Sequence, residues 1–207
     1  MVYGFVRSAT TAAEMMVHLG RLAHGEGFVC GLTAAQWTAL RYFARANRFS
    51  RTVSAFANYH ATTRGTASQT VKSLVSQGYL TRTRLESDGR SARFDLTEAG
   101  RVLYGNDPFE DLVRAIAELP QSLQSKLLAS LEQVMGHMAR ERQKRPFGTC
   151  PFCGHLDECV NRKDEAIEYF CRLENEPIEP SELEEICINF KPSARSAMKR
   201  SFTREPT

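Results

Sequence analysis

Cysteine residues gather in the last third of the chain. Five of the six cysteines lie between Cys150 and Cys187, in the spacing C-x2-C-x5-C-x11-C-x15-C. So short a segment cannot bury a large apolar core, and another agent must therefore order it. Cysteines at these spacings bind zinc or an iron–sulfur cluster, whereas disulfide bonds are the competing explanation.

The first three of these cysteines provide the nucleus of the predicted site. Cys150, Cys153 and Cys159 have the spacing of the cysteine trio that holds four-iron clusters in certain DNA glycosylases and nucleases. A fourth ligand must then come from a more distant position. We expect Cys187 to supply it, with Cys171 as the alternative, because apolar residues around Cys187 would shield a cluster from water.

Zinc is the alternative cofactor. The segment Cys150-Pro-Phe-Cys153-Gly-His155 has the form of a zinc knuckle, in which His155 would be a further ligand. The separations farther along the chain are longer than those of most paired zinc knuckles, which favours an iron–sulfur cluster. We therefore predict an iron–sulfur cluster of the 4Fe-4S rather than the 2Fe-2S type, with zinc as the alternative.

Charge is distributed unevenly along the chain, although the formal net charge is only +3. Residues 32–104 contain 11 Lys and Arg against 4 Asp and Glu, whereas residues 150–190 contain 3 against 11. A basic block followed by an acidic, cysteine-rich block predicts two modules with different partners. The acidic block is expected to lie away from the phosphates of any nucleic acid that the basic block binds.

The sequence also restricts the compartment. No apolar run reaches the roughly 18 residues that a membrane-spanning helix needs. The first residues lack a basic stretch followed by an apolar core, so we predict no signal peptide and no membrane partner. The expected cytoplasmic location keeps thiols reduced, which disfavours disulfide bonds among the cysteines.

Apolar periodicity predicts the elements that must position these side chains. Apolar residues recur at helical spacing over 12–23, and Thr33-Ala-Ala-Gln36 is a capping box that begins a second helix. The pattern later changes to that of a hairpin around a Glu-Ser-Asp-Gly turn. The further elements of this region are helices over 53–59 and 66–77 and a β-hairpin over 79–96.

Helices are also expected in the second half of the chain. Thr97-Glu-Ala-Gly100 begins one, Asp107-Pro-Phe-Glu110 begins another, and a long amphipathic helix spans 121–143. In the cysteine-rich segment, Cys171 lies in an apolar stretch with helical character. Cys187 is expected on a short helix of its own.

The order helix, helix, turn, helix and hairpin is that of a winged helix-turn-helix. Residues 32–40 read LTAAQWTAL, and residues 66–80 read TASQTVKSLVSQGYL. The wing carries Asp88-Gly-Arg90, followed by Leu96-Thr-Glu-Ala-Gly100. On these motifs the chain resembles the MarR family of bacterial transcriptional regulators over about residues 10–143. The resemblance implies a homodimer whose N- and C-terminal helices pack across a two-fold axis.

The resemblance also implies a set of DNA-contacting residues. The second helix of the helix-turn-helix enters the major groove, where short polar and amide side chains can contact base edges. Arg90 lies at the wing tip, where it can enter the minor groove, and nearby arginines are candidates for phosphate contacts. The predicted DNA-binding residues are Arg64, Thr66, Ser68, Gln69, Lys72, Arg84, Arg90 and Arg93. The expected partner is double-stranded DNA with a pseudo-palindromic operator.

The predicted fold is mainly α with a small β-hairpin wing. It combines a winged helix-turn-helix, a helical dimerisation region and a small C-terminal module that binds a metal or cluster. The predicted units are an N-terminal dimerisation helix over 1–31, the winged helix-turn-helix DNA-binding domain over 32–104, C-terminal dimerisation helices over 105–147, the cysteine-rich module over 148–192 and a disordered basic tail over 193–207.

These predictions combine into a regulator rather than an enzyme. We expect a sequence-specific DNA-binding repressor whose cluster senses redox, oxygen or iron status and acts through the helix over 121–143 on the dimer geometry. One alternative keeps the regulator, with a structural zinc site and a small-molecule effector. The other is an iron–sulfur enzyme acting on nucleic acid, but the sequence contains no P-loop, nucleophile elbow or dinucleotide-binding glycine motif.

Overall fold

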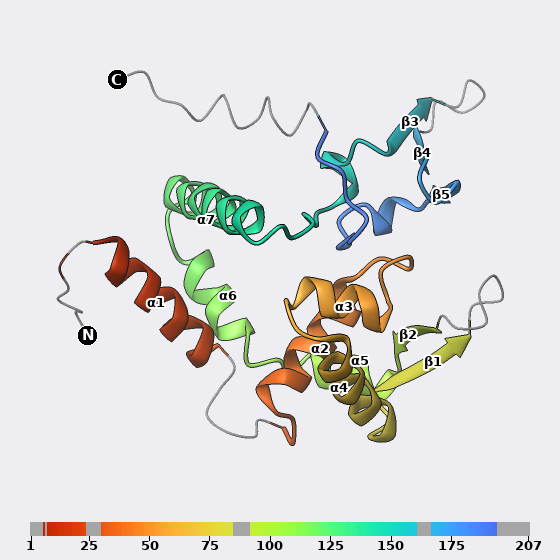
Figure 1. The fold of residues 1–207 in the computed structure, drawn as a ribbon, viewed down its shortest axis with the longest axis horizontal. Helices are drawn as coiled ribbons and strands as arrows, with labels where there is room; N and C mark the ends of the chain where they lie inside the picture. Colours follow the sequence, from red (N-terminus) through yellow and green to blue (C-terminus); the bar gives the residue numbers. More distant parts are fainter. Residues whose placement is uncertain (1–5, 7, 24–29, 85–91, 161–166, 194–207) are drawn as a thin grey trace.

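A computed structural model describes residues 6, 8–23, 30–84, 92–160 and 167–193. Figure 1 shows the winged lobe at the lower right, three helices to its left, and a small β-sheet above it. The helices are α1 (Ala9–Leu22), α2 (Ala34–Arg45), α3 (Val53–Tyr59), α4 (Arg64–Ser76), α5 (Glu98–Tyr104), α6 (Glu110–Ala117) and α7 (Gln121–Glu141). The strands are β1 (Leu80–Arg84), β2 (Ala92–Leu96), β3 (Leu156–Val160), β4 (Ile167–Cys171) and β5 (Glu176–Ile178).

Side-chain caps begin the helices of the winged lobe. At α2, the Gln36 amide nitrogen donates to Thr33 Oγ1 at 3.3 Å, and the Thr33 amide donates to Gln36 Oε1 at 2.8 Å. The predicted capping box is therefore confirmed. At α4, the Thr66 amide donates to Thr63 Oγ1 at 3.1 Å, so the helix begins at Arg64 rather than at Thr66. Each cap pairs an amide that the first helical turn leaves without a partner.

The wing is an antiparallel hairpin of β1 and β2. Leu80 pairs with Leu96 at its base, and Arg84 pairs with Ala92 at the last described pair. The Phe94 amide also donates to the Arg51 carbonyl at 2.8 Å, which attaches β2 to the connection between α2 and α3. The wing tip lies outside the described residues, and with it the predicted role of Arg90.

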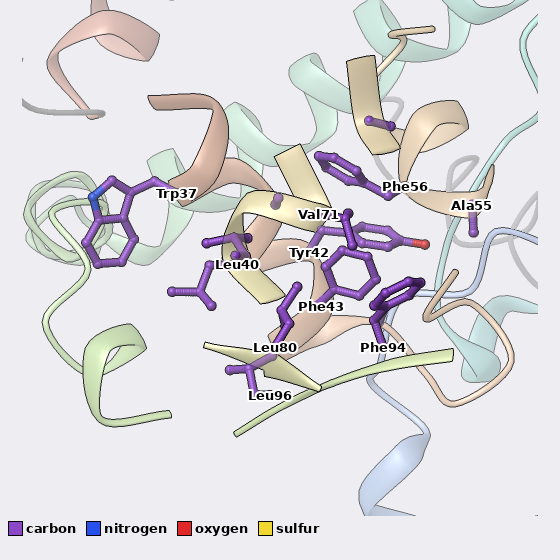
Figure 2. Packing of buried hydrophobic residues seen from close by; sticks show 14 of the residues in the cluster. Trp37, Leu40, Tyr42, Phe43, Ala55, Phe56, Val71, Leu80, Phe94 and Leu96 are labelled. Atoms are coloured by element: carbon purple, nitrogen blue, oxygen red, sulfur yellow. The ribbon is translucent and has the colours of Figure 1, made fainter. Parts of the chain in front are cut away.

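Aromatic side chains form the centre of the winged lobe (Figure 2). The rings of Tyr42, Phe43, Phe56 and Phe94 lie with neighbouring centroids 5.3 to 5.9 Å apart. Tilted and edge-to-face pairs at these separations add to the stabilisation that burial provides. Ile186, from the cysteine-rich segment, belongs to the same apolar core. The winged lobe and the cysteine-rich segment therefore share one core.

The three remaining helices are amphipathic but leave their apolar faces open. Every residue of α1, α6 and α7 is described, and none is buried. Their exposed apolar side chains include Met15, Met16, Leu19, Leu22, Leu123, Leu128, Val134, Met135 and Met138. None of the described helices is long and apolar enough to cross a membrane.

A buried ion pair attaches the start of α6 to the winged lobe. Arg41 Nε lies 2.5 Å from Asp107 Oδ2, and the Asp107 side chain is 2% exposed. Asp107 Oδ1 also accepts a hydrogen bond from the Phe109 amide at 2.9 Å. The Arg41 guanidinium lies over the Phe109 ring, 4.7 Å from its centroid. The chain just before α6 is therefore attached to α2, which packs against α4.

Two secondary-structure predictions in the cysteine-rich segment are wrong. The apolar stretch around Cys171 is strand β4, which pairs antiparallel with β3 and β5. Cys187 is not on a helix: it pairs antiparallel with Gly148, and the helical turn before it covers only Pro180–Glu182. Pairing with distant strands satisfies the backbone here, and no local pattern reports such partners. The predicted disordered tail lies almost wholly outside the described residues.

Candidate DNA-binding surface and cysteine cluster

Helix α4 has one buried face and one exposed polar face. Ala67, Val71 and Leu74 point into the core of the winged lobe. On the other side, the side chains of Arg64, Thr66, Gln69 and Lys72 are exposed and Ser68 is half-buried. The predicted recognition residues of α4 therefore lie where a major groove could reach them, on a helix held rigidly by its buried side.

The arginines of the wing differ in their surroundings. Arg82 and Arg84 on β1 are exposed. Arg93 on β2 instead pairs with Asp95, with Nε 3.1 Å from Oδ2, and its side chain is 34% exposed. A guanidinium that already has a carboxylate partner is less available to a phosphate, so Arg84 is the better phosphate candidate of the predicted pair.

An arginine that the sequence did not single out joins the wing to the cysteine-rich segment. Arg51 lies in the connection between α2 and α3, and its Nη1 is 2.9 Å from Asp95 Oδ1 on β2. Its Nη2 is 3.2 Å from Glu185 Oε1, and its Nε donates to the Ala46 carbonyl at 2.7 Å. Arg51 is therefore a polar link between β2 and the segment that carries Cys187.

Four cysteines line one cavity of about 20 Å³. They are Cys150, Cys153, Cys171 and Cys187, and His155 and Asn47 lie in the same wall. Both candidates for the fourth ligand are thus present together. Cys159, the third member of the predicted trio, does not line the cavity and is exposed.

The position of Cys159 follows from the geometry of β3. Successive side chains of a strand point to opposite faces of a sheet. Leu156 lines the cavity, and Cys159 is an odd number of residues farther along the same strand, opposite Glu168. Cys159 therefore lies on the other face. Alternation along the strand thus separates Cys159 from the cavity once the structure shows that Leu156 faces it.

Backbone hydrogen bonds bring the other cysteines together. Cys150 and Cys153 flank a short 3-10 turn, in which the Cys153 amide donates to the Cys150 carbonyl at 2.9 Å. The Cys187 amide donates to the Gly148 carbonyl at 2.8 Å, which places Cys187 beside the first pair. Cys171 comes from the end of β4. The neighbouring pair Cys150 and Cys153 and the two distant cysteines, Cys171 and Cys187, thus line the same cavity.

Burial controls the ionisation of two of these thiols. Burial and, to a smaller extent, the neighbouring Cys187 thiol raise the pKa of Cys150 to about 12. Burial also raises the pKa of Cys187, but hydrogen bonds from the Asn47 side chain, the Asn189 backbone and the Ser50 side chain oppose this rise. Both are therefore thiols at neutral pH in the absence of a bound cation.

The chemistry of the donor set fits a soft metal centre. Four sulfur donors are typical of zinc and of iron–sulfur clusters. As the side chains stand, no three His, Cys, Asp or Glu side chains in the described residues converge closely enough to hold a single metal ion. Asn47, in the wall of the cavity, is 3% exposed. Its Oδ1 atom has no hydrogen-bond partner among the described residues.

The winged lobe is similar to known proteins. The family model described as "MarR family" matches residues 31–91. The chain is similar to S. aureus MepR in its DNA complex, with a TM-score of 0.54 and 18% identity over 64% of this chain and 99% of that chain. It is also similar to a MarR transcriptional regulator from Methanosarcina mazei Go1, with a TM-score of 0.52 and 21% identity over 63% of this chain and 96% of that chain.

A second MepR structure, in the DNA-binding conformation, gives a TM-score of 0.56 at 18% identity over 63% of this chain and 98% of that chain. No curated protein sequence matches the chain. At these identities the likeness shows a common fold. The chain therefore has the winged-helix fold of these MarR-type structures, which confirms the predicted mainly helical fold with a hairpin wing.

Proposed function

We propose that this chain is a DNA-binding transcriptional regulator that places α4 in the major groove of duplex DNA. The exposed polar face of α4, opposite a fully buried face, is the observation that carries the proposal. The MarR family match over residues 31–91 and the fold shared with MepR bound to DNA support it. In this arrangement Gln69 contacts a base edge and Lys72 lies one turn farther along the groove.

The regulator is proposed to act as a homodimer. Helices α1, α6 and α7 have no buried residue, although each presents apolar side chains. A second copy of the chain would cover these faces and place two α4 helices on a pseudo-palindromic operator. Figure 1 shows that these helices lie on one side of the winged lobe, which leaves α4 and the wing accessible.

Gln69→Ala should weaken specific DNA binding about tenfold, because one side-chain contact with a base is worth roughly 1–3 kcal/mol. Lys72→Ala should weaken binding to all duplexes. It should also reduce the slope of log affinity against log salt concentration by about 1, the value for one phosphate contact. The measurement is fluorescence anisotropy at several salt concentrations, on a duplex that the wild-type protein selects from a random pool. Lys126→Ala, on the exposed surface of α7, is the control and should leave both quantities unchanged.

Met135→Arg on α7 should convert the dimer into a monomer, because Met135 is 51% exposed in the single chain and belongs to the apolar stripe. A buried arginine without a partner is unfavourable in an apolar interface. Light scattering measures the mass. Gln133→Arg, off that stripe, should remain a dimer; a dimeric Met135→Arg protein would contradict the proposed interface.

The proposal extends to control of DNA affinity by the cysteine-rich segment. An iron–sulfur cluster that responds to redox, oxygen or iron status is the proposed form of this control. Structural zinc, with a small-molecule effector, is the alternative. The four cysteines around one cavity and the contacts of Arg51 with both Glu185 and Asp95 support such control. A bound centre would supply bonds that fix the four cysteine-bearing segments relative to one another.

A further inference from the structure

We infer that Cys150, Cys153, Cys171 and Cys187 form a four-thiolate site for a soft metal centre, and that the connection between α2 and α3 supplies part of its wall. The site does not include Cys159. This inference specifies the metal centre of the proposed function, and it rests on that function only for its consequence on DNA binding.

The first argument is convergence from separate segments. The 3-10 turn supplies Cys150 and Cys153, the end of β4 supplies Cys171, and the bridge to Gly148 supplies Cys187. All four side chains line the same cavity. A pair of close ligands and two distant ones is a familiar composition for a site with four cysteine ligands.

The second argument is the polar lining of a cavity whose other walls are apolar. Asn47 and Asn189 line the cavity beside Cys187, and Asn47 is 3% exposed. Amide groups next to cysteine ligands can donate hydrogen bonds to the sulfur atoms and so adjust the properties of a metal centre. Leu156, Leu173 and Ile178 complete the wall.

The third argument is the place of the site in the fold. Asn47 and Ser50 belong to the winged lobe, and both are buried. The Asn47 amide donates to the Ile186 carbonyl at 2.9 Å, and the Ile188 amide donates to Ser50 Oγ at 3.0 Å. Ile186 and Ile188, the two neighbours of Cys187, are therefore both hydrogen-bonded to the winged lobe. A change at Cys187 would therefore act on this connection through its two neighbours.

Zinc and an iron–sulfur cluster share the chemistry of four thiolate ligands, and metal analysis separates them. The full chain is purified without oxygen, and zinc, iron, acid-labile sulfide and visible absorption are measured. The site is supported by about one zinc per chain without colour, or by about four iron and four sulfide with a brown colour. Protein with no stoichiometric metal, or with disulfide bonds among these four cysteines, would overturn it.

Serine variants assign the ligands. Cys150→Ser, Cys153→Ser, Cys171→Ser and Cys187→Ser should each lower the metal content at least tenfold, whereas Cys159→Ser and Cys30→Ser should retain it. Retention by Cys171→Ser together with loss by Cys159→Ser would overturn the assignment.

Alkylation of the wild-type protein tests the assignment without any change that could prevent folding. With the metal bound, Cys30 and Cys159 should react, and the four inferred ligands should react only after chelation. Reaction of the four ligands at equal rates before and after chelation would overturn the site. DNA binding is not measured in any of these experiments. A protein that holds metal on these four cysteines but fails to bind DNA would therefore contradict the proposed function and leave the site intact.

Discussion

Gly100→Ala should lower the free energy of unfolding of the winged lobe by about 3 kcal/mol, at the upper end of the usual penalty for overpacking. A Cβ atom on residue 100 would lie 2.2 Å from the Tyr79 carbonyl oxygen and 3.1 Å from its carbonyl carbon. Both atoms are backbone, so no side-chain rotation can relieve the overlap. Helix α5 would have to move away from the chain that connects α4 to β1.

The surrounding hydrogen bonds oppose that movement. The Thr97 amide donates to the same Tyr79 carbonyl at 3.1 Å, and Thr97 Oγ1 donates to the Gly78 carbonyl at 2.6 Å. Urea unfolding followed by circular dichroism measures the change. Gly20→Ala, in α1, is the matched control, because no neighbouring atom lies within 4 Å of its added Cβ. Alanine should there be neutral or stabilising by up to about 1 kcal/mol, and equal losses for both variants would contradict the packing argument.

The winged lobe was predictable because its local signals agree with its burial pattern. The caps at Thr33 and Thr97 were read from the sequence, and both helices begin beside them. The inward face of α4 also follows from its helical periodicity. The Leu-Thr-x-x-Gly motif ends in Gly100, and its close approach to Tyr79 supplies the physical reason for that glycine.

The cysteine-rich segment was less predictable, because its order depends on contacts between distant residues. Ile167, Tyr169 and Phe170 form an apolar run that fits a short helix and a strand equally well. Pairing with β3 and β5 makes this run a strand. Without the strand assignment, the spacing of the first three cysteines predicted Cys159 as the third ligand, whereas Cys171 lines the cavity and Cys159 does not.

The route from the cysteines to the DNA-binding surface could not be read from the sequence either. The long helix α7 was expected to carry the signal into the dimer interface. The structure contains a more direct connection: Ile186 pairs with Ala46, and Arg51 bridges Glu185 and Asp95. Glu185 and Ile186 lie more than 80 residues from Ala46, Arg51 and Asp95 along the chain, so no local pattern in the sequence reports these contacts.

Emptying the four-cysteine site should weaken specific DNA binding about 30-fold, within the roughly 5- to 150-fold range typical of coupling between two sites. Segment 185–188 holds the connection between α2 and α3 through backbone hydrogen bonds, and it holds β2 through Arg51. Once the metal centre no longer fixes Cys187, this segment can move, and the base of the wing loses one of its supports. Anisotropy with the selected duplex, before and after chelation, measures the change.

Three variants separate this route from a general loss of structure. Cys187→Ser should reproduce the effect of chelation, whereas Cys159→Ser should bind DNA as the wild-type protein does. Glu185→Gln removes the charge that pairs with Arg51 Nη2 at 3.2 Å but leaves all four cysteines in place. It should keep its metal and show a much smaller difference between filled and emptied protein, because the filled site can no longer act on β2 through Arg51 and Asp95. Equal DNA affinity of filled and emptied wild-type protein would show that the site is structural only. A Glu185→Gln protein with the full difference, about 30-fold, would place the coupling in other contacts between the two parts, which include the backbone pairing of Ile186 with Ala46, the Ile188–Ser50 hydrogen bond and the ion pairs of Arg48.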